Sequence, residues 1–109
     1  MDDIRMKNIE RFENAFQFLS GFDLDWHDDY AEPEEIVAEY IEYADRRNRA
    51  DTLGELRQIL AEFQGPELNK AMLSICCFYS PERYRGVPMR EWLDEVIGEL
   101  ERSLIDGSK

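Results

Sequence analysis

The sequence predicts an all-α protein that forms a single compact domain of about five helices. Apolar residues recur at helical spacing in several segments, prolines stand where helices would begin, and glycines stand where helices would end. The chain has 109 residues, of which 43% are hydrophobic, and this suits one domain with one core. We therefore expect one domain over residues 1–109, with frayed ends at 1–8 and 105–109.

Five segments carry the helical pattern, and they begin near Ile9, Pro33, Asp51 or Thr52, Pro66 and Met89. In the fourth segment only Ser74 is polar between Ala71 and Tyr79, so we expect this hydrophobic helix to be the buried centre of the domain. A strand at Ile75–Tyr79 is the alternative. The last segment has a continuous apolar face, and Trp92 on that face is predicted to lie in the core. This face consists of Met89, Trp92, Leu93, Val96, Ile97, Leu100 and Leu104.

The charge of the chain limits its partners. Asp and Glu number 25 against 13 Lys and Arg, which gives a net charge of −12. This charge argues against a nucleic-acid backbone or a membrane as the ligand and favours a basic partner. We see no secretory signal and no run of membrane-spanning length. The adjacent Cys76 and Cys77 are predicted to be reduced thiols. We expect a cytoplasmic protein.

The negative charge is concentrated between Asp23 and Glu42, which we call the acidic stretch. It contains no Lys or Arg, and nine of the 25 acidic residues fall within it. They are Asp23, Asp25, Asp28, Asp29, Glu32, Glu34, Glu35, Glu39 and Glu42. An imbalance this local is a property of one surface, so it indicates where a basic partner would bind.

The helix predicted to begin at Pro33 arranges part of this charge on one face. Glu35, Glu39 and Glu42 fall within about 60° of one another at 100° per residue, and we call these three residues the acidic ridge. A solvated helix face is the ordinary explanation, but continuity with the preceding acids favours a binding surface. The predicted binding residues are Asp23, Asp25, Asp28, Asp29, Tyr30, Glu32, Glu35, Glu39 and Glu42.

A metal or catalytic site is the alternative for the acidic stretch. Asp23, Asp25 and Glu34 fit positions one, three and twelve of a calcium loop, but Asp28 replaces the glycine required at position six. The only histidine is His27, and nucleophile–base pairs and phosphate-binding glycine loops are missing from the sequence. We predict no metal, no cofactor and no enzymatic activity. The rival hypotheses are a metal-binding hydrolase that uses Asp23, Asp25, His27 and Asp28, and a general acidic adaptor module.

Several short motifs are familiar in their order and spacing. They are Phe16-Gln17-Phe18-Leu19, Asp25-Trp26, Tyr30 with Pro33-Glu34-Glu35, Cys77-Phe78-Tyr79-Ser80-Pro81 and Arg90-Glu91-Trp92-Leu93. Together they resemble the small helical immunity proteins of bacterial contact-dependent growth inhibition systems, the CdiI type. The similarity covers roughly Phe12 to Leu100.

The resemblance implies a cytoplasmic, non-enzymatic protein. It would bind and neutralise the C-terminal toxin domain of a cognate effector, and those toxins are often nucleases. We expect a basic nuclease, an RNase in preference to a DNase, in a 1:1 complex, with the acidic surface covering the active site or flanking it. The chain departs from the family pattern at Phe22-Asp23-Leu24-Asp25-Trp26 and at Pro88-Met89. No toxin-binding residue can therefore be transferred by motif, and the first departure lies where specificity would be expected.

Overall fold

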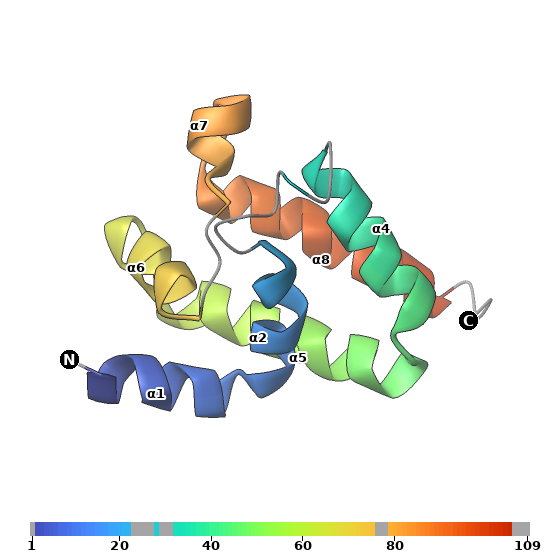
Figure 1. Ribbon diagram of the computed structural model, residues 1–109, viewed down its shortest axis with the longest axis horizontal. Helices are drawn as coiled ribbons and strands as arrows, with labels where there is room; N and C mark the ends of the chain where they lie inside the picture. The colour runs from blue at the N-terminus through green and yellow to red at the C-terminus, as the bar shows by residue number, and fades with distance from the viewer. Residues whose placement is uncertain (1, 23–27, 29–31, 76–78, 106–109) are drawn as a thin grey trace.

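The fold is built from helices packed at several angles around one core (Figure 1). The computed structural model describes the backbone of residues 2–22, 28, 32–75 and 79–105, and the side chains of these residues from residue 7 onward. Every regular element in these ranges is helical, which confirms the all-α prediction. In chain order the elements are α1 (Asp2–Arg11), α2 (Glu13–Leu19), the short 3-10 turn η1 (Ser20–Phe22), α4 (Pro33–Tyr43), α5 (Arg46–Glu62), α6 (Pro66–Ser74), α7 (Pro81–Arg85) and α8 (Met89–Ile105).

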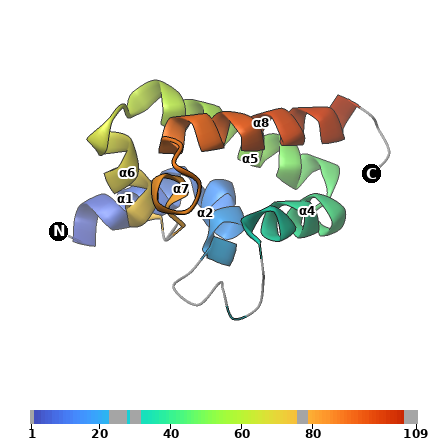
Figure 2. The same cartoon turned by 90° about the horizontal axis from the view of Figure 1, so that it is seen from above.

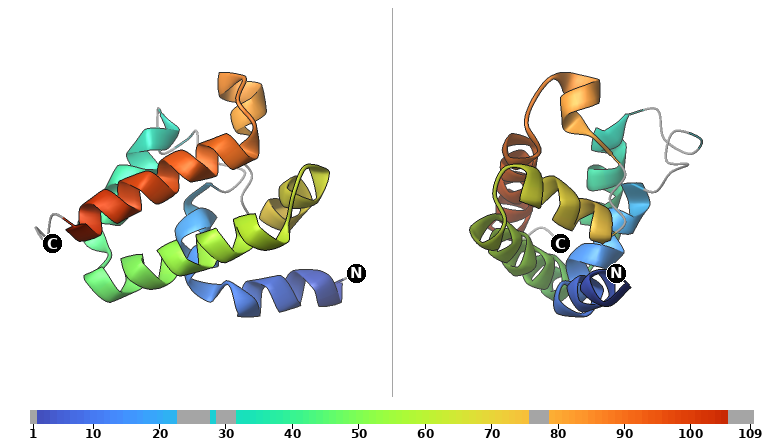
Figure 3. Two further views of the ribbon diagram at one scale, coloured as in Figure 1. Left: turned by 180° about the vertical axis from the view of Figure 1, so that it is seen from behind. Right: turned by 90° about the vertical axis from the view of Figure 1, so that its left-hand side faces the viewer.

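The core lies between α5 and α8. These helices have 17 residues each and pack along each other, and α2 packs against α5 (Figure 3, left). Leu56 of α5 and Leu93 of α8 are both fully buried. The predicted apolar face of α8 is confirmed, because six of its residues are buried and Leu104 packs against the core. Trp92 is 4% exposed. Its ring centroid lies 5.2 Å from the ring centroid of Phe22 and 5.0 Å from that of Tyr79.

The fourth predicted helix has a different place from the one expected. Helix α6 ends at Ser74 and lies at one end of the molecule (Figure 1), with Lys70 exposed and Leu73 54% exposed. The expectation that it forms the buried centre is therefore wrong for Pro66–Ser74. The apolar faces of α5 and α8 are nearly twice as long, so their pairing buries more surface. At the end of the apolar run, Ile75 and Tyr79 are each 1% exposed, and residues 76–78 lie outside the described residues.

The first predicted helix is divided in two. Phe12 leaves the helical conformation at φ −122° and ψ 48°, which ends α1 and starts α2. A carboxylate oxygen of Glu55 in α5 accepts a hydrogen bond from the backbone N–H of Ala15 at 2.9 Å, so a distant residue caps α2. In α1, the buried Asn8 donates to the hydroxyl of Ser74 at 2.8 Å. Helix α1 covers residues 2–8 of the segment for which fraying was predicted, and the fraying itself stays a prediction.

The third helix begins earlier than predicted. Asp45 caps it by accepting a hydrogen bond from the backbone N–H of Asn48 at 2.8 Å, so the expected cap at Asp51 or Thr52 is wrong. The guanidinium of Arg49 is buried and donates to the carbonyl of Ser103 at 3.3 Å, near the C-terminal end of α8. This contact ties the beginning of α5 to the last turn of α8.

Candidate functional site

Helix α4 carries the acidic ridge on the outside of the molecule. It begins at Pro33, as predicted, and it lies beside α8 in Figure 1. Ile36 and Val37 face the core and are 4% and 3% exposed. The three ridge residues are all exposed. The structure therefore brings Glu35, Glu39 and Glu42 together on one accessible helix face, as the spacing predicted.

Helix α4 is held in place by Tyr40. The Tyr40 hydroxyl lies 2.7 Å from the hydroxyl of Thr52 and donates to the carbonyl of Asn48 at 3.2 Å. Its ring packs against that of Phe18 in α2, with the centroids 4.6 Å apart. Burial raises the pKa of Tyr40, and the hydrogen bond with Thr52 partly opposes this rise. The ridge therefore projects from a helix that is fixed to both α2 and α5.

The N-terminus of α4 uses one of the ridge carboxylates as a cap. The backbone N–H of Glu32 donates to Oε1 of Glu35 at 3.0 Å, within a capping box that spans these two residues. Glu35 therefore has a structural role as well as an exposed position. Glu39 and Glu42 lie one and two turns further along the helix, beyond the cap.

The other predicted binding residues divide into two groups. Glu32 and Asp28 are described, and both are exposed. The remaining predicted residues lie outside the described residues, so their role stays a prediction. They are Asp23, Asp25, Asp29 and Tyr30.

Metal chemistry receives no support from the described residues. They contain no group of three or more His, Cys, Asp and Glu side chains that could hold a metal ion. The rival hydrolase hypothesis uses Asp23, Asp25, His27 and Asp28, and of these only Asp28 is described. The described residues therefore do not test that hypothesis, and the absence of a metal stays a prediction.

An exposed aromatic residue at the end of the ridge was not predicted. Tyr43 is 78% exposed, although large apolar rings are usually covered in a folded monomer. Its hydroxyl is hydrogen-bonded to Glu42, and this bond is the main cause of a raised pKa for Tyr43, to which Glu39 also contributes. The position of Tyr43 beside the ridge could have been predicted from its spacing. Tyr43 follows Glu39 by four residues and so lies on the same side of the helix.

Helix α8 has a second row of acids with different surroundings. Glu95 pairs with Arg85 at 2.9 Å, and Glu101 pairs with Arg57 of α5. Partial burial raises the pKa of Glu99; Arg102 opposes this rise, and Glu95 and Glu34 add to it. Helices α4 and α8 contact each other, and Glu34 belongs to α4.

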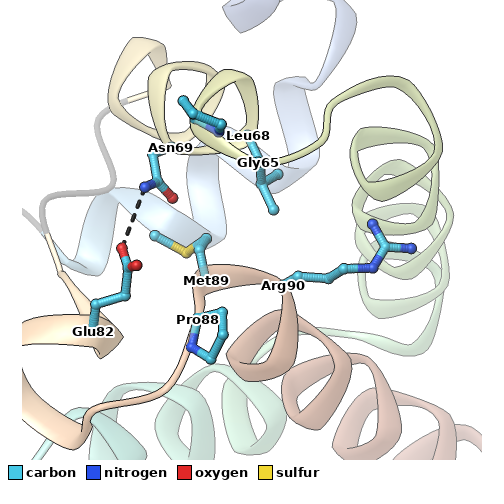
Figure 4. Close-up of a pocket in the computed structure, with 8 residues that line it drawn as sticks. Gly65, Leu68, Asn69, Glu82, Pro88, Met89 and Arg90 are labelled. Carbon is cyan, nitrogen blue, oxygen red and sulfur yellow. Dashed lines mark hydrogen bonds between the residues drawn. The ribbon is translucent and has the colours of Figure 1, made fainter.

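A small hollow lies where α6, α7 and the start of α8 meet (Figure 4). Its volume is about 280 Å³. Asn69 donates to Glu82 across it at 3.3 Å, and Arg90 reaches away toward α5, where it donates to the carbonyl of Leu60 at 3.1 Å. The polar groups of this hollow hold neighbouring elements together, and they form no nucleophile–base pair.

Most of the chain matches a known protein family. Residues 11–100 match the family described as CdiI immunity protein, which confirms the resemblance seen in the motifs. The chain belongs to this family. Membership implies the neutralisation of a cognate toxin by binding, and proteins of this family are generally not enzymes.

No curated protein and no solved structure matches the chain. Among the described helices, none is both long enough and apolar enough to cross a membrane.

Proposed function

We propose that this protein neutralises the C-terminal toxin domain of a cognate contact-dependent growth inhibition effector by binding it through the acidic face of α4. The toxin is a basic nuclease, an RNase in preference to a DNase. The complex is 1:1, forms in the cytoplasm and involves no chemical step, no membrane and no nucleic acid bound by the immunity protein. The proposed contact residues are Asp23, Asp25, Asp28, Asp29, Tyr30, Glu32, Glu35, Glu39 and Glu42.

The observation that carries this proposal is the exposed acidic ridge on a rigidly held helix. A nuclease holds phosphate groups with Lys and Arg side chains, so its substrate cleft presents positive charge. The carboxylates of Glu35, Glu39 and Glu42 offer that cleft a competing set of negative groups. Because Tyr40 fixes α4 to α5, the backbone of the ridge loses little conformational entropy when it meets the toxin.

Charge complementarity also accelerates association. A net charge of −12, concentrated in one stretch, attracts a basic domain over a distance comparable to the Debye length. Electrostatic steering raises association rates by about 10- to 1,000-fold at low salt. Fast capture suits an immunity protein, because a toxin domain that remains free can reach its substrate.

The test measures the affinity for the C-terminal domain of the large effector encoded beside this chain. The domain is made with its catalytic residue inactivated, and the salt concentration is varied. Converting Asp28, Asp29, Glu35 and Glu39 to their amides is expected to weaken binding about tenfold or more at low salt and to flatten the salt dependence. A control converts the exposed Glu10, Glu67, Glu91 and Asp94 instead, which changes the net charge equally. Equal effects of the two sets would contradict the proposal, as would a neighbouring gene that encodes no such effector.

Competition with nucleic acid separates the two ways in which the acidic face can act. If the face covers the active site, a non-cleavable RNA and the immunity protein exclude each other from the toxin domain. If the face binds beside the active site, both bind at once while cleavage is still inhibited.

A further inference from the structure

A groove runs beside the acidic ridge, between α4 on one wall and α2 with η1 on the other. Figure 2 shows these helices next to each other. The volume of the groove is about 440 Å³. We call it the α2–α4 groove, and it is lined by Gln17, Phe18, Ser20, Gly21, Ile36, Glu39, Tyr40, Tyr43 and Ala44. Glu39 belongs both to this groove and to the acidic ridge, so the two features form one continuous surface.

The floor of the groove is apolar and aromatic. Phe18 and Ile36 are 2% and 4% exposed, and the half-buried ring of Tyr40 packs against Phe18. The backbone of η1 comes close to α4 at Gly21, where an added Cβ would lie 2.9 Å from Cγ2 of Ile36. The floor is therefore formed by packed core residues, which makes the groove a fixed feature of the fold.

The rim of the groove is acidic and aromatic. The exposed carboxylate of Glu39 and the exposed ring of Tyr43 stand four residues apart on the same side of α4. On the opposite wall the exposed rim residues are Gln17 and Ser20. No Lys or Arg is among the residues that line the groove. Its chemistry suits a side chain with an apolar stem and a cationic end.

Arginine fits this description better than lysine. Its planar guanidinium stacks on an aromatic face and donates two parallel hydrogen bonds to a carboxylate. Its three methylene groups can cover the apolar floor while the charged end stays at the rim. Exposed aromatic side chains next to a pocket are also frequent anchors of protein interfaces.

We propose that the α2–α4 groove receives an arginine side chain of the toxin domain. The stem of that arginine lies over the half-buried ring of Tyr40, and its guanidinium lies between the carboxylate of Glu39 and the ring of Tyr43. This proposal rests on the proposed function, since it assumes that the acidic face of α4 meets the toxin. It adds a specific anchor that lengthens the lifetime of the complex, whereas the ridge as a whole accelerates its formation.

The experiment measures the dissociation rate and affinity of the inactivated toxin domain for four variants. Tyr43→Ala removes the ring at the rim, and Gln17→Arg places a cation of the protein's own on the opposite wall. Both are expected to weaken binding about tenfold or more, mainly through faster dissociation. Gln17→Glu adds a carboxylate at the same position and is expected to leave binding equal or tighter. Tyr84→Ala, at a tyrosine of α7 that is 49% exposed, is the control and should change affinity less than about twofold. Circular dichroism and thermal melting check that each variant is folded.

The groove proposal is wrong if Tyr43→Ala and Gln17→Arg both bind like the wild type, or if Gln17→Glu weakens binding as much as Gln17→Arg. The double variant Glu35→Gln and Glu42→Gln alters the ridge but none of the residues lining the groove. If this variant weakens binding while the groove variants do not, the proposed function stands and only the groove proposal fails. If the ridge variant also binds like the wild type, both fail.

Discussion

Helices α4 and α8 both carry rows of carboxylates, yet the two rows have different relations to the rest of the molecule. Helix α8 contains Arg90 and Arg102, buries six residues in the core, and has Glu95 and Glu101 in ion pairs with arginines of neighbouring elements. Helix α4 contains no Lys or Arg, buries three residues, and presents the acidic ridge beside the exposed ring of Tyr43.

This difference distinguishes charged residues that stabilise the fold from charged residues that are available to bind a partner. On α8, Glu95 and Glu101 are paired with arginines of the same protein, so the field of these two acids is partly cancelled at a distance. Helix α4 itself supplies no cation to its exposed acids, and we expect their field to attract a basic domain. Substitutions on α8 should therefore affect stability, whereas substitutions on the outer face of α4 should affect binding.

The largest effect is expected in the core face of α8. Leu93 is fully buried, and Leu93→Ala should lower the free energy of unfolding by about 2–5 kcal/mol, because it removes apolar contacts and leaves a cavity. Urea denaturation measures this change in the free energy of unfolding. Leu73→Ala, at a leucine that is 54% exposed, is the control and should cost less than about 0.5 kcal/mol. Similar losses for the two variants would mean that α8 is not the centre of the core.

The next effect concerns the polar support of α2. Glu55 accepts hydrogen bonds from the side chain of Asn14 at 2.7 Å and from the backbone of Ala15 at 2.9 Å. Glu55→Ala removes both and should cost about 1–3 kcal/mol in urea denaturation. Gln58→Ala, an exposed position on the same helix, should change stability by less than about 0.5 kcal/mol. A loss below that limit for Glu55→Ala would show that α2 does not depend on this cap.

The core face of α8 and the start of α4 could be predicted from sequence because their signals are local. The apolar spacing from Met89 to Leu100 has one consistent period, and Pro33 fixes the first turn of α4. The acidic ridge followed from the same periodicity, since it depends only on residues within one helix.

The remaining features depend on contacts between distant residues. The break at Phe12 has no glycine or proline to announce it, and Glu55 caps the helix that follows from about 40 positions away. The start of α5 was missed because the arginine-rich segment has no apolar periodicity, although Arg49 is buried against Ser103. The α2–α4 groove required the close approach at Gly21, which no local pattern indicates.

A smaller effect is expected where α4 is fixed to α5. Tyr40→Phe leaves the buried hydroxyl of Thr52 without this partner and should cost about 1 kcal/mol. The pKa of Tyr40 is raised above its ordinary value of 10.0, so the folded state keeps its proton at a pH where the unfolded chain loses it. Stability should therefore fall as the pH rises above about 10, and this part of the fall should be missing in Tyr40→Phe. The midpoint of urea denaturation, measured from about pH 8 to 11 for the wild type and Tyr40→Phe, gives this pH dependence of stability. Tyr84→Phe is the control. Equal slopes in the wild type and Tyr40→Phe would contradict this role of the hydroxyl.

The smallest effect is expected where the two acidic rows meet. Partial burial raises the pKa of Glu99 above its ordinary value of 4.5, so ionisation costs more in the folded state than in the unfolded chain. The contribution of Glu99 to stability is therefore most favourable at low pH and falls as the pH rises through this range. Glu99→Gln should slightly raise the melting temperature at pH 7 relative to the wild type, and the gain should shrink toward pH 4. Glu91→Gln on the outer face is the control; a lowered melting temperature at pH 7 for Glu99→Gln alone would contradict this account.

The most direct test of the central claim compares association rates for two variants of equal charge. Glu39→Gln with Glu42→Gln alters α4, and Glu91→Gln with Asp94→Asn alters α8; all four residues are exposed. Stopped-flow association with the inactivated toxin domain is measured from low to physiological salt. We predict that the α4 variant associates several-fold more slowly at low salt, with a flatter salt dependence, while the α8 variant stays close to the wild type. Equal slowing of the two variants, or a slower α8 variant, would contradict the claim that α4 carries the recognition surface.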